Sequence, residues 1–261
     1  MDLKDAVCIV TGASSGIGKA TAIVLARRGA IAVGCARRLE KLEDTLTQCR
    51  KYSPQSFLVQ CDVSDPQAVG SMVESVLGAF GRIDVLVANA GVGRYRPFVE
   101  ESLESIEEQV KTNLLGQMYC THAVLPHMLE RRRGHLVLLS STNGRMYPPM
   151  MSVYNATRAG TIGFGEGLIP ELKPYGIGVT IVYPGAIDTE FFDAAEFKRM
   201  RKPKGQPAEK MAAAIVKGIE RNKADVTFPR SLKIPAAMRA LFPGMVRSGT
   251  ARYAKDALPK P

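Results

Sequence analysis

Cysteine and histidine are scarce in this 261-residue sequence, and long apolar runs are absent. The 5 cysteines and 3 histidines include no C-x-x-C pair and no spacing typical of metal ligands. We therefore expect no disulfide framework and no metal site, and a reducing compartment such as the cytoplasm is favoured. No stretch reaches the roughly 18 consecutive apolar residues that a membrane-spanning helix requires. The acidic start of the chain, Met1-Asp2-Leu3-Lys4-Asp5, does not resemble a secretory signal, which again favours the cytoplasm.

The composition is that of a soluble globular protein, with 46% hydrophobic and 23% charged residues. This balance excludes disorder over most of the chain, and the length suits one large α/β domain better than two small ones. The net charge of +10 is unevenly distributed. Residues 196–261 hold 16 lysines and arginines against 5 acidic residues, whereas the rest of the chain is nearly neutral. Such a basic region suggests an anionic partner surface.

Short apolar runs alternate with longer amphipathic stretches along most of the chain. The runs lack period-two alternation, as expected for strands that are buried on both faces. The expected strands are residues 6–11, 31–36, 56–61, 83–88, 134–140, 177–183 and 225–228. The expected helices are residues 16–28, 39–51, 65–80, 102–129, 152–173 and 208–222. This alternation predicts right-handed βαβ units, and therefore a doubly wound, Rossmann-type α/β domain with a parallel sheet.

One shift in composition marks a change late in the chain. Residues 197–207 are rich in Lys, Arg and Pro, which is typical of a mobile loop. We predict that residues 1–228 form a dinucleotide-binding domain that includes a substrate loop at 190–207. Residues 229–261 are then a basic, partly amphipathic C-terminal tail.

A glycine-rich segment, Thr11-Gly12-Ala13-Ser14-Ser15-Gly16-Ile17-Gly18, joins the first expected strand to the first expected helix. Glycines allow the chain to turn sharply and to bring backbone N–H groups close to a pyrophosphate, while the helix N-terminus favours an anion. The spacing G-x-x-x-G-x-G differs from the common fingerprint G-x-G-x-x-G. In this strand-to-helix context a dinucleotide site is favoured over a turn without a ligand.

Five segments in the same order resemble motifs of the short-chain dehydrogenase/reductase family. Besides Thr11 to Gly18 they are Asn89-Ala90-Gly91, Asn113, Ser140-Ser141 with Tyr154, and Pro184-Gly185 with Thr189. Tyr154 follows Ser141 by 13 residues, which is the separation found in that family. The resemblance covers about residues 5–228, and an ordered set of motifs is specific. It implies that a nicotinamide dinucleotide is held by Gly12, Ser14, Ser15, Gly16, Ile17, Gly18, Arg37, Arg38, Asp62, Val63, Asn89, Ala90, Gly91, Tyr154, Arg158, Pro184, Gly185, Ile187 and Thr189.

The end of the second expected strand bears on which nicotinamide cofactor binds. An NAD site usually places an acidic residue there to accept from the ribose 2′-hydroxyl, whereas the 2′-phosphate of NADP needs cationic donors. Here Ala36 stands in place of the acid, and Arg37 and Arg38 follow. A planar guanidinium suits phosphate, so NADP(H) is favoured, with Arg37 the stronger candidate, Arg38 in support and Asp62 at the adenine. The alternative is that both arginines are merely solvated residues at a helix start.

The resemblance assigns the chemistry to Tyr154 as general acid/base and to Ser141 as the donor that orients the substrate oxygen. Asn113 is the implied relay partner on the preceding long helix. A free tyrosine titrates near pH 10, so it needs a neighbouring cation to work at neutral pH. These roles imply the interconversion of a small-molecule ketone and a secondary alcohol by hydride transfer.

The sequence departs from the family pattern at the cation. The family has Y-x-x-x-K, whereas this chain reads Tyr154-Asn155-Ala156-Thr157-Arg158. Arg158 lies on the same helix face and keeps the positive charge, but its guanidinium is bulkier and does not release a proton. An enzyme with altered activity is the favoured interpretation. The alternative is a non-catalytic, NADP(H)-binding regulatory protein of the same fold.

Substrate and assembly are less clearly encoded. Met146, Tyr147, Met150 and Met151 suit either a pocket for an apolar substrate or the core. In residues 231–247, the apolar residues Ile234, Met238, Leu241, Phe242 and Met245 recur at helical spacing beside cations. This stripe either packs on the domain or lies in a membrane interface, which would make the protein peripheral to a membrane. No motif supports nucleic-acid binding. The resemblance implies a homodimer or homotetramer built on the helices at 102–129 and 152–173.

Overall fold

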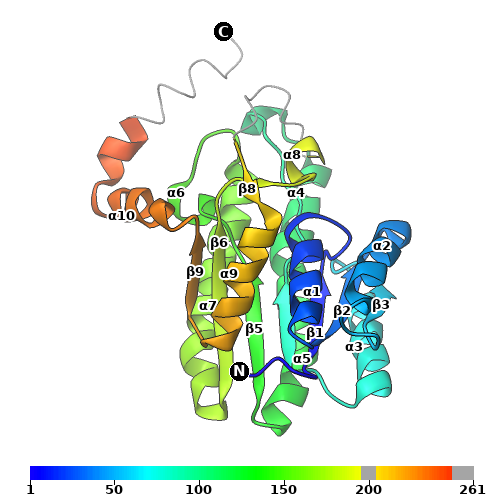
Figure 1. Ribbon diagram of the computed structural model, residues 1–261. Helices are drawn as coiled ribbons and strands as arrows, with labels where there is room; N and C mark the ends of the chain where they lie inside the picture. Colours follow the sequence, from blue (N-terminus) through cyan, green and yellow to red (C-terminus); the bar gives the residue numbers. More distant parts are fainter. Residues whose placement is uncertain (195–203, 249–261) are drawn as a thin grey trace.

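A seven-stranded parallel sheet forms the centre of the computed structural model, which describes residues 1–194 and 204–248 (Figure 1). The strand order is β3-β2-β1-β4-β5-β6-β9, and every neighbouring pair is parallel. The strands are β1 Val7–Thr11, β2 Ile31–Ala36, β3 Phe57–Gln60, β4 Val85–Ala88, β5 Gly134–Leu139, β6 Ile177–Pro184 and β9 Asp225–Phe228. The predicted doubly wound α/β fold is therefore confirmed, and the seven expected strands are present.

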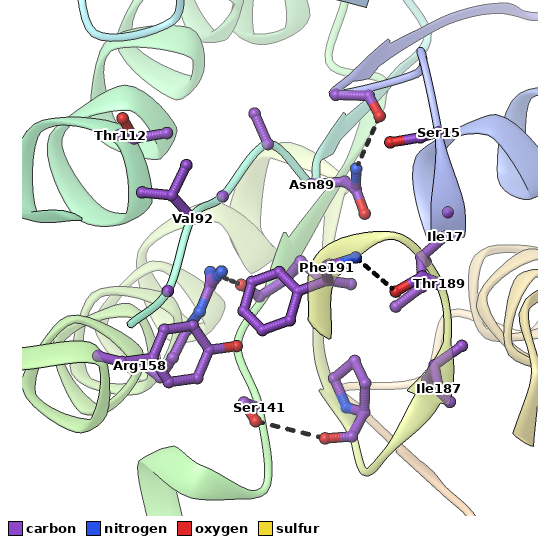
Figure 2. Close-up of a pocket in the computed structure, with 18 of the residues that line it drawn as sticks. Ser15, Ile17, Asn89, Val92, Thr112, Ser141, Arg158, Ile187, Thr189 and Phe191 are labelled. Carbon is purple, nitrogen blue, oxygen red and sulfur yellow. Dashed lines mark hydrogen bonds between the residues drawn. The ribbon is translucent and has the colours of Figure 1, made fainter. Parts of the chain in front are cut away.

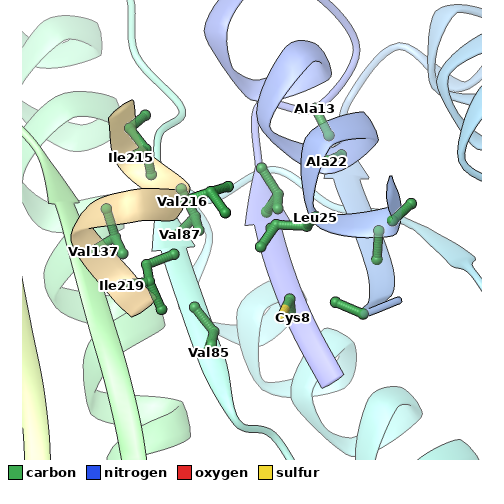
Figure 3. Packing of buried hydrophobic residues seen from close by; sticks show 14 of the residues in the cluster. Cys8, Ala13, Ala22, Leu25, Val85, Val87, Val137, Ile215, Val216 and Ile219 are labelled. Carbon is green, nitrogen blue, oxygen red and sulfur yellow. The ribbon is translucent and has the colours of Figure 1, made fainter. Parts of the chain in front are cut away.

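Helices cover both faces of the sheet (Figure 1). One face carries α1 Gly16–Arg27, α2 Leu39–Arg50 and α9 Ala208–Glu220, and the other carries α3 Pro66–Phe80, α5 Gly116–Glu130 and α7 Ser152–Leu172. Figure 3 shows the first of these layers, where Ile215 and Ile219 of α9 and Leu25 of α1 meet Val85 and Val137 of the sheet. Because the strands are buried on both faces, their apolar runs are continuous in sequence.

Local signals in the sequence set both ends of α3. Asp65 caps the helix, since its side chain accepts from the Gln67 N–H at 2.9 Å, and Pro66 occupies the first helical position. Gly81 ends the helix in the left-handed conformation, with φ of 69°.

The expected long helix at 102–129 is present, but it contains a π-helical turn that was not expected. Here the chain forms α4 Leu103–Val110, a π-helical turn Lys111–Leu115, and then α5. The π turn places the Asn113 side chain against the backbone of Val92, to which it makes two hydrogen bonds. A periodicity of 3.6 residues does not reveal such an inserted turn, because the apolar pattern continues on both sides of it.

Short elements near the carboxyl edge of the sheet were also not expected. They are α6 Asn143–Met146, β7 Ile187–Asp188, α8 Phe191–Ala194 and β8 Gln206–Pro207, with β7 and β8 paired in parallel. Residues 195–203 of the expected substrate loop at 190–207 lie outside the described residues.

The amphipathic stripe at 231–247 is not a single helix. α10 Lys233–Leu241 ends at Phe242, which has non-helical φ and ψ of −128° and 62°, and a further helical turn covers residues 243–248. Ile234, Leu241 and Met245 are 70%, 71% and 59% exposed, so they do not pack on the domain in the described part of the chain. The contact with a membrane interface stays a prediction, and residues 249–261 lie outside the described part.

Among the residues that the structure describes, no helix is both long enough and apolar enough to cross a membrane.

His135 in β5 is expected to make the fold sensitive to acid. It is 2% exposed, and its Nε2 lies 2.8 Å from Thr180 Oγ1. Burial, with a smaller contribution from the N-terminal ammonium, lowers the pKa of His135 to about 4. Since an unfolded histidine titrates near 6.5, the stability that the neutral ring contributes is present above about pH 6.5. As the pH falls from about 6.5 toward 4, the free energy of unfolding decreases by about 3 kcal/mol from this group.

We therefore expect His135→Gln to flatten the pH dependence of the free energy of unfolding between pH 7 and about 4, measured by urea denaturation. The control is His122→Gln, which changes an exposed histidine of α5. An unchanged slope in His135→Gln would contradict this assignment.

Candidate active site

A cavity of about 620 Å³ opens at the carboxyl ends of the strands, where the strand order reverses between β1 and β4 (Figure 2). This is the edge of a doubly wound sheet at which ligands bind. The cavity is lined by nearly all of the site residues expected from sequence: Gly12, Ser14, Ser15, Gly16, Ile17, Arg37, Arg38, Asp62, Val63, Asn89, Ala90, Gly91, Ser141, Tyr154, Arg158, Pro184, Gly185, Ile187 and Thr189. Gly18 and Asn113 are the two that do not line it.

The glycine loop leads from β1 into α1 beside this cavity. Gly12 adopts the left-handed conformation with φ of 68°, which turns the chain sharply toward the helix N-terminus. A Cβ at Gly18 would overlap the Gly12 carbonyl oxygen and the Asn89 side-chain amide. Gly18 thus serves the close packing of helix on loop, although it does not line the cavity.

Asn89 ties the loop to the neighbouring strand. Its Nδ2 donates to the Thr11 carbonyl oxygen at 2.8 Å, and the backbone N–H groups of Asn89 and Ala90 each donate to Thr11 Oγ1 at 3.0 Å. These bonds hold the glycine loop against the end of β4.

Arg37 and Asp62 face each other at one end of the cavity, with 3.7 Å between Arg37 Nη1 and Asp62 Oδ2. Partial burial alone would raise the pKa of Asp62. The Ser64 N–H at 3.0 Å, the Ser64 hydroxyl at 2.8 Å and the Arg37 charge outweigh burial and hold that pKa below its usual value. The carboxylate is therefore ionised at neutral pH, as a hydrogen-bond acceptor for an adenine amine requires.

Arg38 lies directly on the glycine loop. Its Nη2 donates to Ser15 Oγ at 2.9 Å and to Ser14 Oγ at 3.2 Å, and its Nη1 donates to Glu190 Oε2 at 3.2 Å. Lys41 Nζ donates to the same carboxylate at 2.7 Å. The hydrogen bond from Lys41, followed by the contact with Arg38, holds the pKa of Glu190 below its usual value.

Two of the charged residues around Arg38, Lys41 and Glu190, were not predicted from the sequence. Lys41 lies in the first turn of α2, three residues after Arg38, which is the N-cap of that helix, and this short separation was available as a signal. Glu190 comes from a segment 152 residues away, and no sequence pattern indicates that it reaches this helix.

Ser141 and Tyr154 both line the other end of the cavity. Ser141 follows β5; its Oγ accepts from the Asn143 N–H at 3.1 Å and donates to the Pro184 carbonyl oxygen at 3.4 Å. Tyr154 on α7 is 8% exposed, and its ring centroid lies 5.7 Å from that of Phe191. Tyr154, the predicted general acid/base, and Ser141, the predicted oxygen-orienting donor, thus line one cavity, and Phe191 is an aromatic neighbour that the sequence did not reveal.

Arg158 carries a buried positive charge beside Tyr154. The residue is 3% exposed, and its guanidinium carbon lies 4.9 Å from the centroid of the Tyr154 ring. Nη1 donates to the Leu139 carbonyl oxygen at 2.7 Å, whereas Nε is buried without a hydrogen-bond partner (Figure 2). No carboxylate lies within 4.0 Å of this guanidinium among residues 1–194 and 204–248. The charge therefore acts on the cavity without internal neutralisation.

Asn113 lies behind the cavity wall and is fully buried. Its Oδ1 accepts from the Val92 N–H at 2.7 Å, and its Nδ2 donates to the Val92 carbonyl oxygen at 2.8 Å and to Thr157 Oγ1 at 3.2 Å. The side chain thereby fixes the chain beside Gly91. Its role as a relay partner stays a prediction.

The cavity is apolar around Tyr154. Met151, Pro148, Pro149, Phe191 and Phe192 are among the residues that line it there. Of the four candidates for the substrate pocket, Met151 alone lines the cavity. Met150 is buried in a small cluster with Tyr95 and Tyr154, and Tyr147 is 46% exposed with Arg239 over its ring.

Comparisons with known proteins agree with this geometry. The family model described as short chain dehydrogenase matches residues 6–199. Dehydrogenase/reductase SDR family member 7B of Xenopus tropicalis is 34% identical over 97% of this chain and 87% of its own length.

Two solved structures share the fold. A short-chain dehydrogenase of Sphingobium yanoikuyae in complex with NADPH is 28% identical, with a TM-score of 0.80 over 98% of this chain and 97% of its own. A short chain dehydrogenase/reductase of Burkholderia phymatum in complex with NAD is 23% identical, with a TM-score of 0.87 over 92% of this chain and 94% of its own, and shows the fold alone. Solved relatives thus include complexes with either cofactor.

Proposed function

Because the chain belongs to the short-chain dehydrogenase/reductase family of oxidoreductases, we propose that it is an NADP(H)-dependent enzyme that interconverts a ketone and a secondary alcohol. One observation carries this proposal. A single cavity has the glycine loop with Arg38 at one end, and Ser141, Tyr154 and Arg158 at the other. A dinucleotide that spans the cavity would present its nicotinamide to the tyrosine.

The residues present fit NADP. Backbone N–H groups at the start of α1 and the hydroxyls of Ser14 and Ser15 suit the phosphates, and a side chain at Gly12 or Gly18 would collide with the Asn89 amide that holds this loop. Arg37 and Arg38 stand where a 2′-phosphate needs donors, and Ala36 offers no acceptor to a ribose 2′-hydroxyl. Arg158 lines the cavity, and its buried Nε is a donor without a partner, as a ribose hydroxyl requires.

In the proposed reaction the bound cofactor supplies or accepts a hydride at its nicotinamide ring. In the reductive direction, the Tyr154 hydroxyl gives its proton to the substrate oxygen as the carbonyl becomes an alkoxide. The Ser141 hydroxyl donates a hydrogen bond to that oxygen and stabilises the developing negative charge. The Arg158 charge favours the phenolate that remains.

The apolar lining around Tyr154 supports an apolar carbonyl substrate. We also propose a homo-oligomer built on α5 and α7, which rests on the family resemblance. The proposed cytoplasmic location and the proposed membrane contact of α10 rest on the sequence arguments given above. The regulatory alternative is favoured by one observation, the arginine at position 158, and would keep cofactor binding without turnover.

The experiment that tests the cofactor assignment is a titration with NADPH and NADH. We expect wild type to bind NADPH more tightly. Arg37→Ala and Arg38→Ala should each lose on the order of 1.5–3 kcal/mol of binding free energy for NADPH, the range for a charge-assisted hydrogen bond, and little for NADH.

The matched control is Lys19→Ala, which removes one positive charge from α1 at a residue that pairs with Asp44 and does not line the cavity. Equal affinity of wild type for the two cofactors would refute the proposed preference.

A further inference from the structure

Glu190 places a carboxylate between two cations at the phosphate end of the cavity. Its Oε2 lies 3.2 Å from Arg38 Nη1 and 2.7 Å from Lys41 Nζ, and Arg38 is at the same time bonded to Ser14 and Ser15. The Glu190 carboxylate thus occupies an anion-binding position where Arg38 meets the glycine loop. We propose that Glu190 is a specificity-determining residue that competes with the cofactor's 2′-phosphate for Arg38 and Lys41.

The residues on both sides of Glu190 are fixed by contacts, so its carboxylate is held close to the two cations. Thr189 packs against Gly16, where an added Cβ would lie 3.1 Å from its side chain. The Phe191 N–H donates to Thr189 Oγ1 at 3.3 Å, and the Phe191 ring lies against Tyr154. Figure 2 shows Thr189 beside Ile17 and Phe191 reaching toward Arg158 across the cavity. This segment crosses the space between the two ends of the site.

The contacts of Glu190 are of the kind that a stronger anion displaces. The side chains of Arg38, Lys41 and Glu190 are 51%, 46% and 51% exposed, and ion pairs at such exposure contribute little. A phosphate monoester carries up to two negative charges and more acceptor oxygens than a carboxylate, so it binds the same cations more strongly. A ribose 2′-hydroxyl has no charge with which to displace Glu190. The competition therefore acts on NADP(H) and not on NAD(H).

Displacement also has a consequence inside the site. Glu190 directly precedes Phe191, which covers Tyr154. When a 2′-phosphate takes the two cations, the segment that carries Phe191 loses one of its anchors. The same carboxylate therefore links recognition of the 2′-phosphate to the cover over the proton donor.

This inference rests on the proposed NADP(H) site, and its test is binding rather than turnover. NADPH and NADH are titrated against Glu190→Gln, which keeps the shape of the side chain and removes its charge. We expect the dissociation constant for NADPH to fall about threefold to tenfold, the worth of two exposed ion pairs, and that for NADH to change by less than about twofold. Lys41→Met should weaken NADPH binding by a similar factor, and the gain from Glu190→Gln should shrink in the Lys41→Met background.

The matched control is Asp44→Asn, which removes one negative charge from α2 at a residue that pairs with Lys19 rather than with the cluster. If wild type prefers NADPH but Glu190→Gln behaves as Asp44→Asn does, this inference fails and the proposed function stands. An equal decrease in the dissociation constants for NADPH and NADH in Glu190→Gln also overturns this inference, because the effect would not involve the 2′-phosphate. Wild type that shows no preference for NADPH overturns the inference together with the proposed cofactor.

Discussion

Replacing Tyr154 by phenylalanine should reduce turnover by a factor of about 10²–10⁴, the range for loss of a general acid, and leave NADPH affinity nearly unchanged. The substitution removes only the hydroxyl. The ring contacts with Phe191 at 5.7 Å and with the Arg158 guanidinium at 4.9 Å are kept, so the cavity should retain its shape. The measurement is the rate of NADPH oxidation with a panel of ketones, alongside a titration of NADPH.

Tyr147→Phe is the matched control, since Tyr147 is 46% exposed and does not line the cavity. Turnover that is unimpaired in Tyr154→Phe would mean that another residue is the acid/base. Both the proposed mechanism and the role that the family resemblance assigns to Tyr154 would then be wrong.

The second large effect is expected at Arg158. The Arg158 guanidinium carbon lies 4.9 Å from the centroid of the Tyr154 ring. A unit charge at about this distance stabilises a phenolate by on the order of 3 kcal/mol at an effective dielectric constant near 20. Arg158→Met should therefore slow turnover about a hundredfold near neutral pH. In the oxidative direction Tyr154 acts as a base. Without the cation that favours the phenolate, the activity of Arg158→Met should shift toward alkaline pH. The pH profile of alcohol oxidation measures this shift.

Arg158→Lys is the matched variant, because it keeps the charge and restores the family's residue on the same helix face. We expect it to preserve the wild-type pH range and to raise kcat if the guanidinium geometry limits wild type. Nη1 of Arg158 is bound to the Leu139 carbonyl oxygen, so one of its donors is not free for the cofactor. A profile for Arg158→Met that coincides with that of wild type would contradict the electrostatic role.

The fold was predictable because continuous apolar strands and capped helices are local signals. β1, β2 and β4 lie in the sheet that their hydrophobic runs predict, and Asp65 caps α3 as its sequence indicates. The π-helical turn at Lys111–Leu115 within the long helix was not predictable, since its residue Asn113 contacts Val92, 21 residues earlier in the chain. Periodicity carries no information about such long-range contacts.

The site was predictable where residues are fixed by a motif and not where they meet through the fold. The glycine loop, Ser141, Tyr154 and Arg158 line one cavity, as their motifs indicate. Glu190 and Phe191 lie directly after the motif of Pro184, Gly185 and Thr189, and they have no recognisable code. Glu190 reaches Arg38 because the neighbouring Thr189 packs against Gly16 of the glycine loop. Asn113 shows the converse, since its position in the motif does not reveal that its amide is committed to the backbone of Val92.

The proposed hydride transfer is tested most directly by following the hydride itself. NADPH that carries deuterium at the transferable position of its nicotinamide is incubated with the protein and a panel of apolar ketones, and the products are examined by mass spectrometry. The account predicts a secondary alcohol with one deuterium on its carbinol carbon from wild type, at a much lower yield from Tyr154→Phe. NADPH bound by wild type, with no deuterium in any product from wild type or Arg158→Lys, would contradict it and leave the regulatory alternative.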